Sequence, residues 1–218
     1  IYDRTKGIDG YISLEVSPLI AGDTATTLSE AKRLFKAVDR PNLMIKIPGT
    51  PEGVGAIEQA IYEGININVT LLFSVEAYEK VHDAYLTGLE RRQSEGKSLD
   101  VASVASFFVS RVDSAVDKRL EASGHEELCG KAAIANARVA YRNFEAVLAS
   151  PRWQGLHHGG AHPQRPLWAS TGVKNERYPD TMYVDELVGA HTVNTMPLAT
   201  LKAVADHGRI SGPTAQRD

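Results

Sequence analysis

Apolar runs rich in β-branched residues alternate with helical patterns along the chain. Four of these runs are long, and two near the C-terminus are shorter. Strands are predicted over residues 10–16, 42–47, 65–72, 101–109, 166–170 and 191–195. Between them, apolar positions recur at three- and four-residue spacing, as they do on one face of a helix. The pattern therefore predicts strand–helix alternation over most of the sequence.

Capping residues and glycines mark where the predicted helices begin and end. Asp23 or Thr24 begins a helix after the first strand, and Ser74 begins one over 75–91. Pro51 stands at the first position of a helix over 51–62, with Gly64 as its stop. The longest link, 113–164, is predicted to hold two helices and a Gly-, His- and Pro-rich loop over 155–166. One of these helices covers 131–149 and ends before Pro151, because proline cannot continue a helix.

Alternating strands and helices predict an α/β fold, a parallel sheet covered by helices. Both a doubly wound open sheet and a (β/α)8 barrel satisfy the pattern. The sequence shows no internal repeat, low-complexity tract or interdomain linker. We therefore expect residues 1–218 to form a single domain.

Composition excludes several classes of protein. The chain has 218 residues, 43% of them hydrophobic, and a net charge of −3, so it is typical of globular proteins. No basic stripe predicts nucleic-acid binding, and no apolar stretch reaches the roughly 18 residues that a membrane span needs. The single cysteine, Cys129, excludes a disulfide framework and favours a reducing, cytoplasmic location.

Polar residues interrupt the apolar strands near their C-terminal ends, where barrel enzymes carry their catalytic groups. These residues are Glu15, Lys46, Asn68, Thr70, Ser106 and Ser170. Lys46 is the sharpest case, since isoleucines flank it on both sides. A desolvated lysine amine becomes neutral and attacks carbonyl groups to form a Schiff base. The alternatives are a lysine that reaches water at the strand end or one paired with Glu15.

Two cations lie just beyond predicted strands. Arg111 follows the fourth strand, with serine hydroxyls nearby, and suits a bidentate grip on phosphate. The alternative is a surface arginine that opens a helix and pairs with Asp113 and Asp117. Lys174 is either a second phosphate contact or part of the loop surface.

Other motifs carry less chemistry. The glycines of 48–55 lack the order of a phosphate-binding loop or of a dinucleotide fingerprint. His157, His158 and His162 form a small cluster, but no carboxylate or cysteine completes a recognisable metal-ligand spacing, and a solvated loop is the alternative. We therefore assign no metal site.

Several segments resemble the transaldolase family. Segment 43–50, with Lys46, resembles its Schiff-base lysine strand, and 66–74, with Asn68 and Thr70, is similar to the next strand. Segment 106–111 has the family's phosphate-binding Ser-x-Phe-x-x-Arg pattern, and 13–16 looks like its glutamate strand. Segments 168–175 and 192–197 look like later strands of the long bacterial branch. The resemblance covers nearly the whole chain.

This resemblance implies a (β/α)8 TIM barrel of the class I aldolase type. It also implies a cofactor-free, metal-independent transferase of the pentose phosphate pathway. Such an enzyme moves a dihydroxyacetone unit from sedoheptulose 7-phosphate or fructose 6-phosphate to an aldose phosphate. The resemblance makes Lys46, Glu15 and Thr70 catalytic. The substrate-binding residues that it implies are Asn68, Ser106, Phe108, Arg111, Ser170 and Lys174.

The chain also departs from the family pattern. Lys174 stands where the family commonly has an arginine. The family's first-strand aspartate and second-strand asparagine have no counterpart, and the first visible strand matches the family's third. With a start at Ile1 instead of Met, these departures predict an N-terminally truncated barrel of about six of the eight β/α units.

Two alternative functions stay open at this stage. One is another Schiff-base aldolase, which cleaves without transfer. The other is a catalytically impaired phosphosugar-binding barrel fragment. The expected partners are sugar phosphates, with neither nucleic acid nor membrane, and a homodimer is compatible with the sequence.

Overall fold

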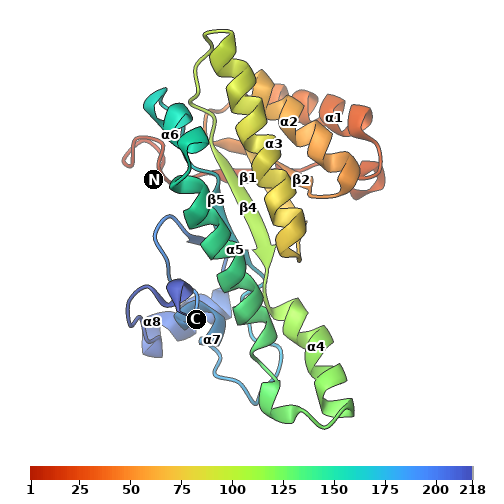
Figure 1. Cartoon of the computed structure of the whole chain (residues 1–218), viewed down its shortest axis with the longest axis vertical. Coiled ribbons are helices and arrows are strands. Elements are labelled where there is room, and N and C mark those ends of the chain that lie inside the picture. Colours follow the sequence, from red (N-terminus) through yellow and green to blue (C-terminus); the bar gives the residue numbers. More distant parts are fainter. Residues whose placement is uncertain (218) are drawn as a thin grey trace. The chain divides into compact units, whose positions relative to one another are not determined.

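The computed structural model describes residues 1–217, in which strands alternate with helices along the chain (Figure 1). The strands are β1 (Ile12–Glu15), β2 (Leu43–Pro48), β3 (Ile67–Leu72), β4 (Ser103–Phe108), β5 (Arg165–Ala169) and β6 (Val193–Asn194). The α-helices are α1 (Thr24–Val38), α2 (Pro51–Glu63), α3 (Val75–Ser94), α4 (Ser110–Ala122), α5 (Ala132–Leu148), α6 (Pro151–His158), α7 (Met182–Asp185) and α8 (Leu198–His207). Short 3-10 helices cover η1 (Pro18–Ile20), η2 (Glu126–Leu128) and η3 (Thr214–Gln216).

The six strands follow one another in the sheet in chain order, from β1 to β6. The pairs β1–β2, β2–β3 and β5–β6 run parallel. A doubly wound sheet reverses its strand order at a switch point, whereas the strand order among the described residues has no reversal. Of the two predicted folds, this is the barrel type, represented by six strands and the helices between them.

The chain divides into two compact units. The first unit comprises Ile1–Leu72, Glu76–Ala105 and Val147–Gln164, and the second comprises Phe73–Val75, Ser106–Ala146 and Arg165 onward. Strand β4 begins in the first unit and ends in the second.

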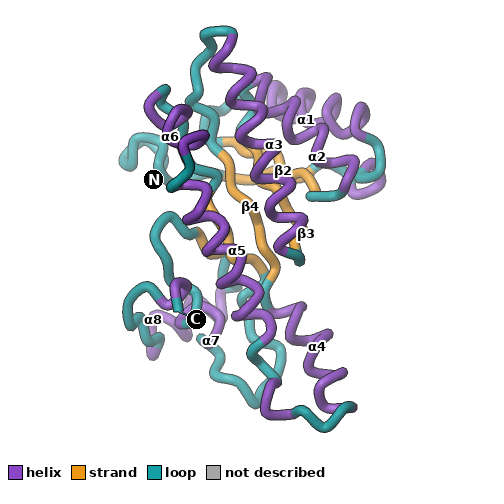
Figure 2. Tube along the Cα trace, in the orientation of Figure 1, coloured by secondary structure: helices purple, strands orange, loops and turns teal. Residues whose placement is uncertain are grey.

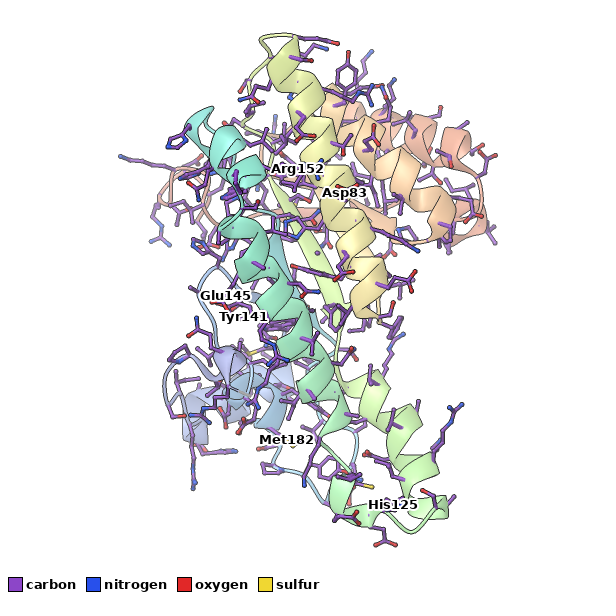
Figure 3. The ribbon with its side chains drawn as sticks, viewed as in Figure 1. Asp83, His125, Tyr141, Glu145, Arg152 and Met182 are labelled. Atoms are coloured by element: carbon purple, nitrogen blue, oxygen red, sulfur yellow. The ribbon has the colours of Figure 1, made fainter. Side chains whose placement is uncertain are left out.

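In the first unit, the core forms around β2 and β3. Ile45 and Ile47 of β2 and Ile67 and Val69 of β3 are completely buried. Helix α1 packs against both α2 and β2 (Figure 2). Arg152 of α6 donates from Nε to Glu90 at 2.7 Å and also contacts Asp83 of α3 (Figure 3). These ion pairs tie α6 to α3.

Trp168 of β5 lies at the centre of the second unit's core. Its ring contacts those of Phe107 and Tyr141, with centroid distances of 6.4 and 6.5 Å. Its indole Nε1 donates to the carbonyl oxygen of Leu187 at 2.8 Å, which satisfies the one polar group of a buried tryptophan. The aromatic cluster therefore holds β5 against α5 and the segment that follows α7.

Residues that were predicted to begin and end helices do so in the structure. Asp23 is the N-cap of α1, and its carboxylate accepts from the Thr26 amide at 3.0 Å. Gly64 ends α2 in a left-handed conformation with φ of +88°, which glycine adopts without steric cost. Both ends therefore lie where the sequence predicts them.

One prediction was wrong at Pro151. The loop expected over 155–166 begins only after His158, because α6 occupies Pro151–His158. Proline ends α5, but it also starts α6, since its fixed φ suits a first helical position. The Ser150 hydroxyl completes this start by accepting from the Trp153 amide at 3.2 Å. None of the helices within residues 1–217 is long and apolar enough to cross a membrane.

Candidate active site

Glu15, Lys46 and Asn68 form one row across three adjacent strands of the first unit. The parallel register pairs Glu15 with Lys46, and Lys46 with Asn68. Residues in register on neighbouring parallel strands point to the same face of the sheet. The sheet therefore brings together three of the residues predicted from sequence.

Lys46 differs from its neighbours in β2. The other five residues of β2 are buried, whereas the Lys46 side chain is 28% exposed. Its Nζ lies 3.2 Å from Oε2 of Glu15, which is 45% exposed. Lys46 is thus paired with Glu15, one of the alternatives that the sequence leaves open. At this distance the carboxylate is within reach for proton exchange with the amine.

Asn68 is held by a residue that the sequence analysis missed. Its side-chain Nδ2 donates to the hydroxyl of Ser13 at 2.9 Å. Ser13 lies two residues before Glu15 in β1, so the two side chains share one face of the strand. The period-2 spacing of Ser13 and Glu15 was the available signal.

Thr70 lies two residues beyond Asn68 in β3 and is completely buried. Its Oγ1 has no hydrogen-bond partner within the described part of the chain. Buried hydroxyls are normally paired, so an orphan of this kind is a place for a water molecule or a ligand atom. The next residue, Leu71, has a left-handed φ of +60°, a strained conformation of the kind that concentrates at functional sites.

The predicted phosphate residues lie in the second unit. Ser106 and Phe108 are buried in β4, and Arg111 is an exposed residue in the first turn of α4. The Arg111 guanidinium carbon lies 4.9 Å from the centroid of the Phe108 ring. This cation–π contact places the guanidinium group over the Phe108 ring, in a residue that is exposed as a whole.

Ser170 follows β5 with a left-handed φ of +56°. Its hydroxyl lies 3.0 Å from that of Ser110, and its carbonyl oxygen accepts from the Ser110 amide at 3.1 Å. The start of α4 is therefore fixed to the end of β5. Lys174 is exposed and lines an open cavity of about 670 Å³ together with residues of α4.

The alternative pairing of Arg111 with Asp113 and Asp117 was wrong. Asp113 accepts hydrogen bonds from the Ala133 amide and the Tyr183 hydroxyl, and Asp117 accepts from the Gly130 amide and the Tyr178 hydroxyl. Both oxygens of each carboxylate are therefore engaged by groups other than Arg111.

The histidines of 157–162 do not share one centre. The His157 ring stacks on Trp153, with centroids 5.7 Å apart, while His162 lies 3.3 Å from the carboxylate of Asp100. Within residues 1–217, no group of three or more His, Cys, Asp or Glu side chains could hold a metal ion.

Comparison with known proteins places this chain in one family. The family model described as Transaldolase/Fructose-6-phosphate aldolase matches residues 1–218. Similar curated proteins include a transaldolase from Thermobifida fusca, 59% identical over 99% of this chain and 60% of its own length. Transaldolase 1 of Streptomyces avermitilis is 59% identical over 98% of this chain and 58% of its length. A transaldolase of Acidothermus cellulolyticus is 58% identical, with the same two shares.

These relatives are longer proteins, and the chain spans about 60% of their length. The match nevertheless covers every strand and helix described above. The chain belongs to the transaldolase/fructose-6-phosphate aldolase family.

Proposed function

We propose that this chain carries the Schiff-base chemistry of a transaldolase, with Lys46 as the covalent residue. The observation that carries the proposal is the Lys46 amine in register with Glu15, 3.2 Å from its carboxylate. It is supported by the family match over the whole chain. The reaction transfers a dihydroxyacetone unit from a ketose phosphate, sedoheptulose 7-phosphate or fructose 6-phosphate, to an aldose phosphate.

In the first step the neutral Lys46 amine attacks the ketone carbon. The carbonyl oxygen takes two protons, one of them from the attacking nitrogen, and leaves as water, and the nitrogen becomes part of an iminium ion. The bond between the carbon next to the iminium carbon and the hydroxyl-bearing carbon beyond it then breaks, while that hydroxyl loses its proton and becomes the aldehyde group of the leaving sugar. The electron pair of the broken bond moves toward the iminium nitrogen, an aldose phosphate leaves, and an enamine stays on Lys46. The enamine attacks the aldehyde carbon of the acceptor, and hydrolysis of the new iminium ion frees the product and the amine.

Glu15 and Thr70 supply the proton transfers of imine formation in this proposal. The Glu15 carboxylate accepts a proton from the Lys46 ammonium, and the unpaired Thr70 hydroxyl holds the water that carries protons onward. Asn68 binds the hydroxyl groups of the substrate, since an amide both donates and accepts hydrogen bonds.

The substrate phosphate is assigned to residues of the second unit. The planar guanidinium of Arg111 donates two hydrogen bonds to the phosphate, and the Lys174 ammonium adds a positive charge beside it. Ser106 and Ser170 contribute hydroxyl groups, and Phe108 supports the Arg111 side chain. Binding energy from the phosphate orients the carbonyl group, although the phosphate does not react.

The proposal also covers the partners, location and oligomeric state of the enzyme. The partners are sugar phosphates, the location is the cytoplasm, and residues 1–218 belong to one barrel domain that associates as a homodimer. The single cysteine and mild acidity support the location. Light scattering of the purified chain tests the dimer.

A transfer assay tests the proposal. The chain is incubated with fructose 6-phosphate and erythrose 4-phosphate, and formation of sedoheptulose 7-phosphate is followed in the wild type and in Lys46→Arg. We expect transfer by the wild type and none by the variant, because a guanidinium does not form an imine. An active Lys46→Arg variant would contradict the proposal. Release of dihydroxyacetone without an acceptor would indicate the alternative, an aldolase that cleaves without transfer.

A further inference from the structure

Helix α4 carries three acids at four-residue spacing: Asp113, Asp117 and Glu121. This spacing places them in one stripe along the helix. Asp113 is only 1% exposed and Asp117 only 7%. Buried carboxylates are rare in proteins and costly unless they are fully paired. Asp113 and Asp117 are therefore not part of a solvated helix face, and their carboxylates need partners within the protein.

Asp113 and Asp117 are paired in the same way. Each accepts one backbone amide from the chain that enters α5: Ala133, in the first turn, donates to Asp113 at 2.7 Å, and Gly130, just before the helix, donates to Asp117 at 3.0 Å. Each also accepts one tyrosine hydroxyl, from Tyr183 at 2.8 Å and from Tyr178 at 2.7 Å. Each carboxylate therefore joins three segments of the second unit.

A third pair continues the stripe at the end of α4, four residues before His125, which is labelled in Figure 3. Here Glu121 pairs with Arg177. We call the pairs Asp113–Tyr183, Asp117–Tyr178 and Glu121–Arg177 the carboxylate ladder. Gly130 has a left-handed φ of +74°, and a Cβ at this position would lie 2.9 Å from the Tyr178 ring. The backbone at Gly130 thus leaves room for the tyrosine of the middle pair.

The ladder connects two residues of the proposed phosphate grip. Arg111 lies in the first turn of α4, two residues before Asp113. Lys174 precedes Arg177 by three residues and Tyr178 by four. Lys174 also lines the 670 Å³ cavity together with Asp113, Asp117 and Glu121. With both oxygens of each aspartate engaged, these carboxylates compete less with the phosphate for the Lys174 ammonium.

We propose that the carboxylate ladder is a positioning device for phosphate binding. It holds the Lys174 segment on the helix that presents Arg111, and it keeps the buried carboxylates from pairing with Lys174. This inference rests on the proposed function, because it assumes that Arg111 and Lys174 bind the substrate phosphate. The ladder residues themselves do not touch the substrate.

The test is Tyr178→Phe in the full chain, compared with Tyr62→Phe. Tyr62 forms a similar hydrogen bond, 2.9 Å from its hydroxyl to Glu95, but lies in the first unit. Substrate is trapped on Lys46 with borohydride at increasing concentrations of fructose 6-phosphate or of dihydroxyacetone, which has no phosphate. Titration with inorganic phosphate in a calorimeter provides a reading that needs no chemistry.

We expect Tyr178→Phe to raise the half-saturating concentration of fructose 6-phosphate about fivefold and to weaken inorganic phosphate by a similar factor. The maximal trapping rate and the half-saturation by dihydroxyacetone stay within twofold of the wild type, and Tyr62→Phe changes nothing. Asp117→Asn keeps an oxygen for Gly130 and an amide group for Tyr178, so it behaves closer to the wild type than Asp117→Ala. Arg177→Gln, at an exposed pair, shows a smaller effect of the same kind.

Equal changes with both substrates in Tyr178→Phe and Arg177→Gln, or no change in either variant, would overturn the inference in favour of a merely structural role. If the wild type traps no substrate, the proposed function fails, and phosphate titration then decides on the ladder. Unaltered phosphate affinity in Tyr178→Phe, or no affinity in the wild type, refutes the positioning role.

Discussion

Glu15 and Lys46 form an ion pair whose two side chains are both partly exposed. Pairs of this kind contribute little to stability, because water and salt screen them. Their separation of 3.2 Å is nevertheless short enough for direct proton transfer. We propose that the pair serves the chemistry of Lys46 more than the stability of the fold, and substitution of Glu15 separates the two contributions.

Glu15→Gln is expected to slow imine formation about 100-fold, because the amide cannot take the proton from Lys46. The measurement is the rate of borohydride trapping at saturating fructose 6-phosphate. Stability to denaturant is expected to stay close to that of the wild type. A trapping rate within twofold of the wild type would remove Glu15 from the proton path.

Arg111→Lys replaces a planar fork with a point charge. We expect the half-saturating concentration of fructose 6-phosphate to rise about tenfold, with no change for dihydroxyacetone. Arg119→Lys is the matched control, since Arg119 is an exposed arginine of the same helix. If Arg111→Lys and Arg119→Lys behave alike, Arg111 is a surface residue and not a phosphate ligand.

The alternation of apolar and polar residues predicted which side chains lie together on one face of the first unit's sheet. Alternation in 42–47 placed Lys46 on the opposite face from its isoleucine neighbours, and it is the one residue of β2 that is not buried. Pattern alone did not predict the partner of Asn68. That contact with Ser13 depends on register between strands that are distant in sequence.

Among the helices, α3 carries a buried titratable residue. His82 is 3% exposed, and its ring meets the edge of the Tyr78 ring at a centroid distance of 5.7 Å. Burial, with a smaller contribution from the charge of Arg152, lowers the pKa of His82 to about 4. The folded chain therefore keeps this imidazole neutral, whereas the unfolded chain protonates it near pH 6.5.

It follows that stability associated with His82 is fully present above pH 6.5 and is lost as the pH falls toward 4. The expected loss from this group is about 3 kcal/mol. Urea unfolding at pH 7, 5.5 and 4 measures it, and His82→Gln is expected to show a shallower decline. Parallel declines in the two proteins would show that His82 does not titrate on unfolding.

Capping residues, glycines and prolines predicted helix ends correctly where each residue serves a single helix end. Pro151 had two, since it ends α5 and begins α6, and only the first was read from the sequence. The acids of α4 are similar. The sequence shows their spacing, but their partners Tyr178 and Tyr183 lie 61 and 70 residues further along the chain, and no local rule connects the two.

For the whole molecule, the strand–helix pattern predicted six strands and their alternation with helices but left two sheet architectures open, and the resemblance to transaldolases predicted the barrel. The strand order confirms the barrel type, and this order is a long-range property that periodicity does not encode. Strand β6 consists of two residues, and α7 of four, so neither is long enough for a periodic pattern to define it. Family membership agrees with the barrel order and extends over residues 1–218.

The central claim is that Lys46 forms a covalent imine with a ketose phosphate, and reductive trapping tests it most directly. The chain is treated with borohydride in the presence of fructose 6-phosphate, digested and examined by peptide mass spectrometry. The account predicts a ketose-derived mass increase on the peptide that contains Lys46, absent without sugar. No adduct at Lys46, or an adduct on another lysine, would contradict it.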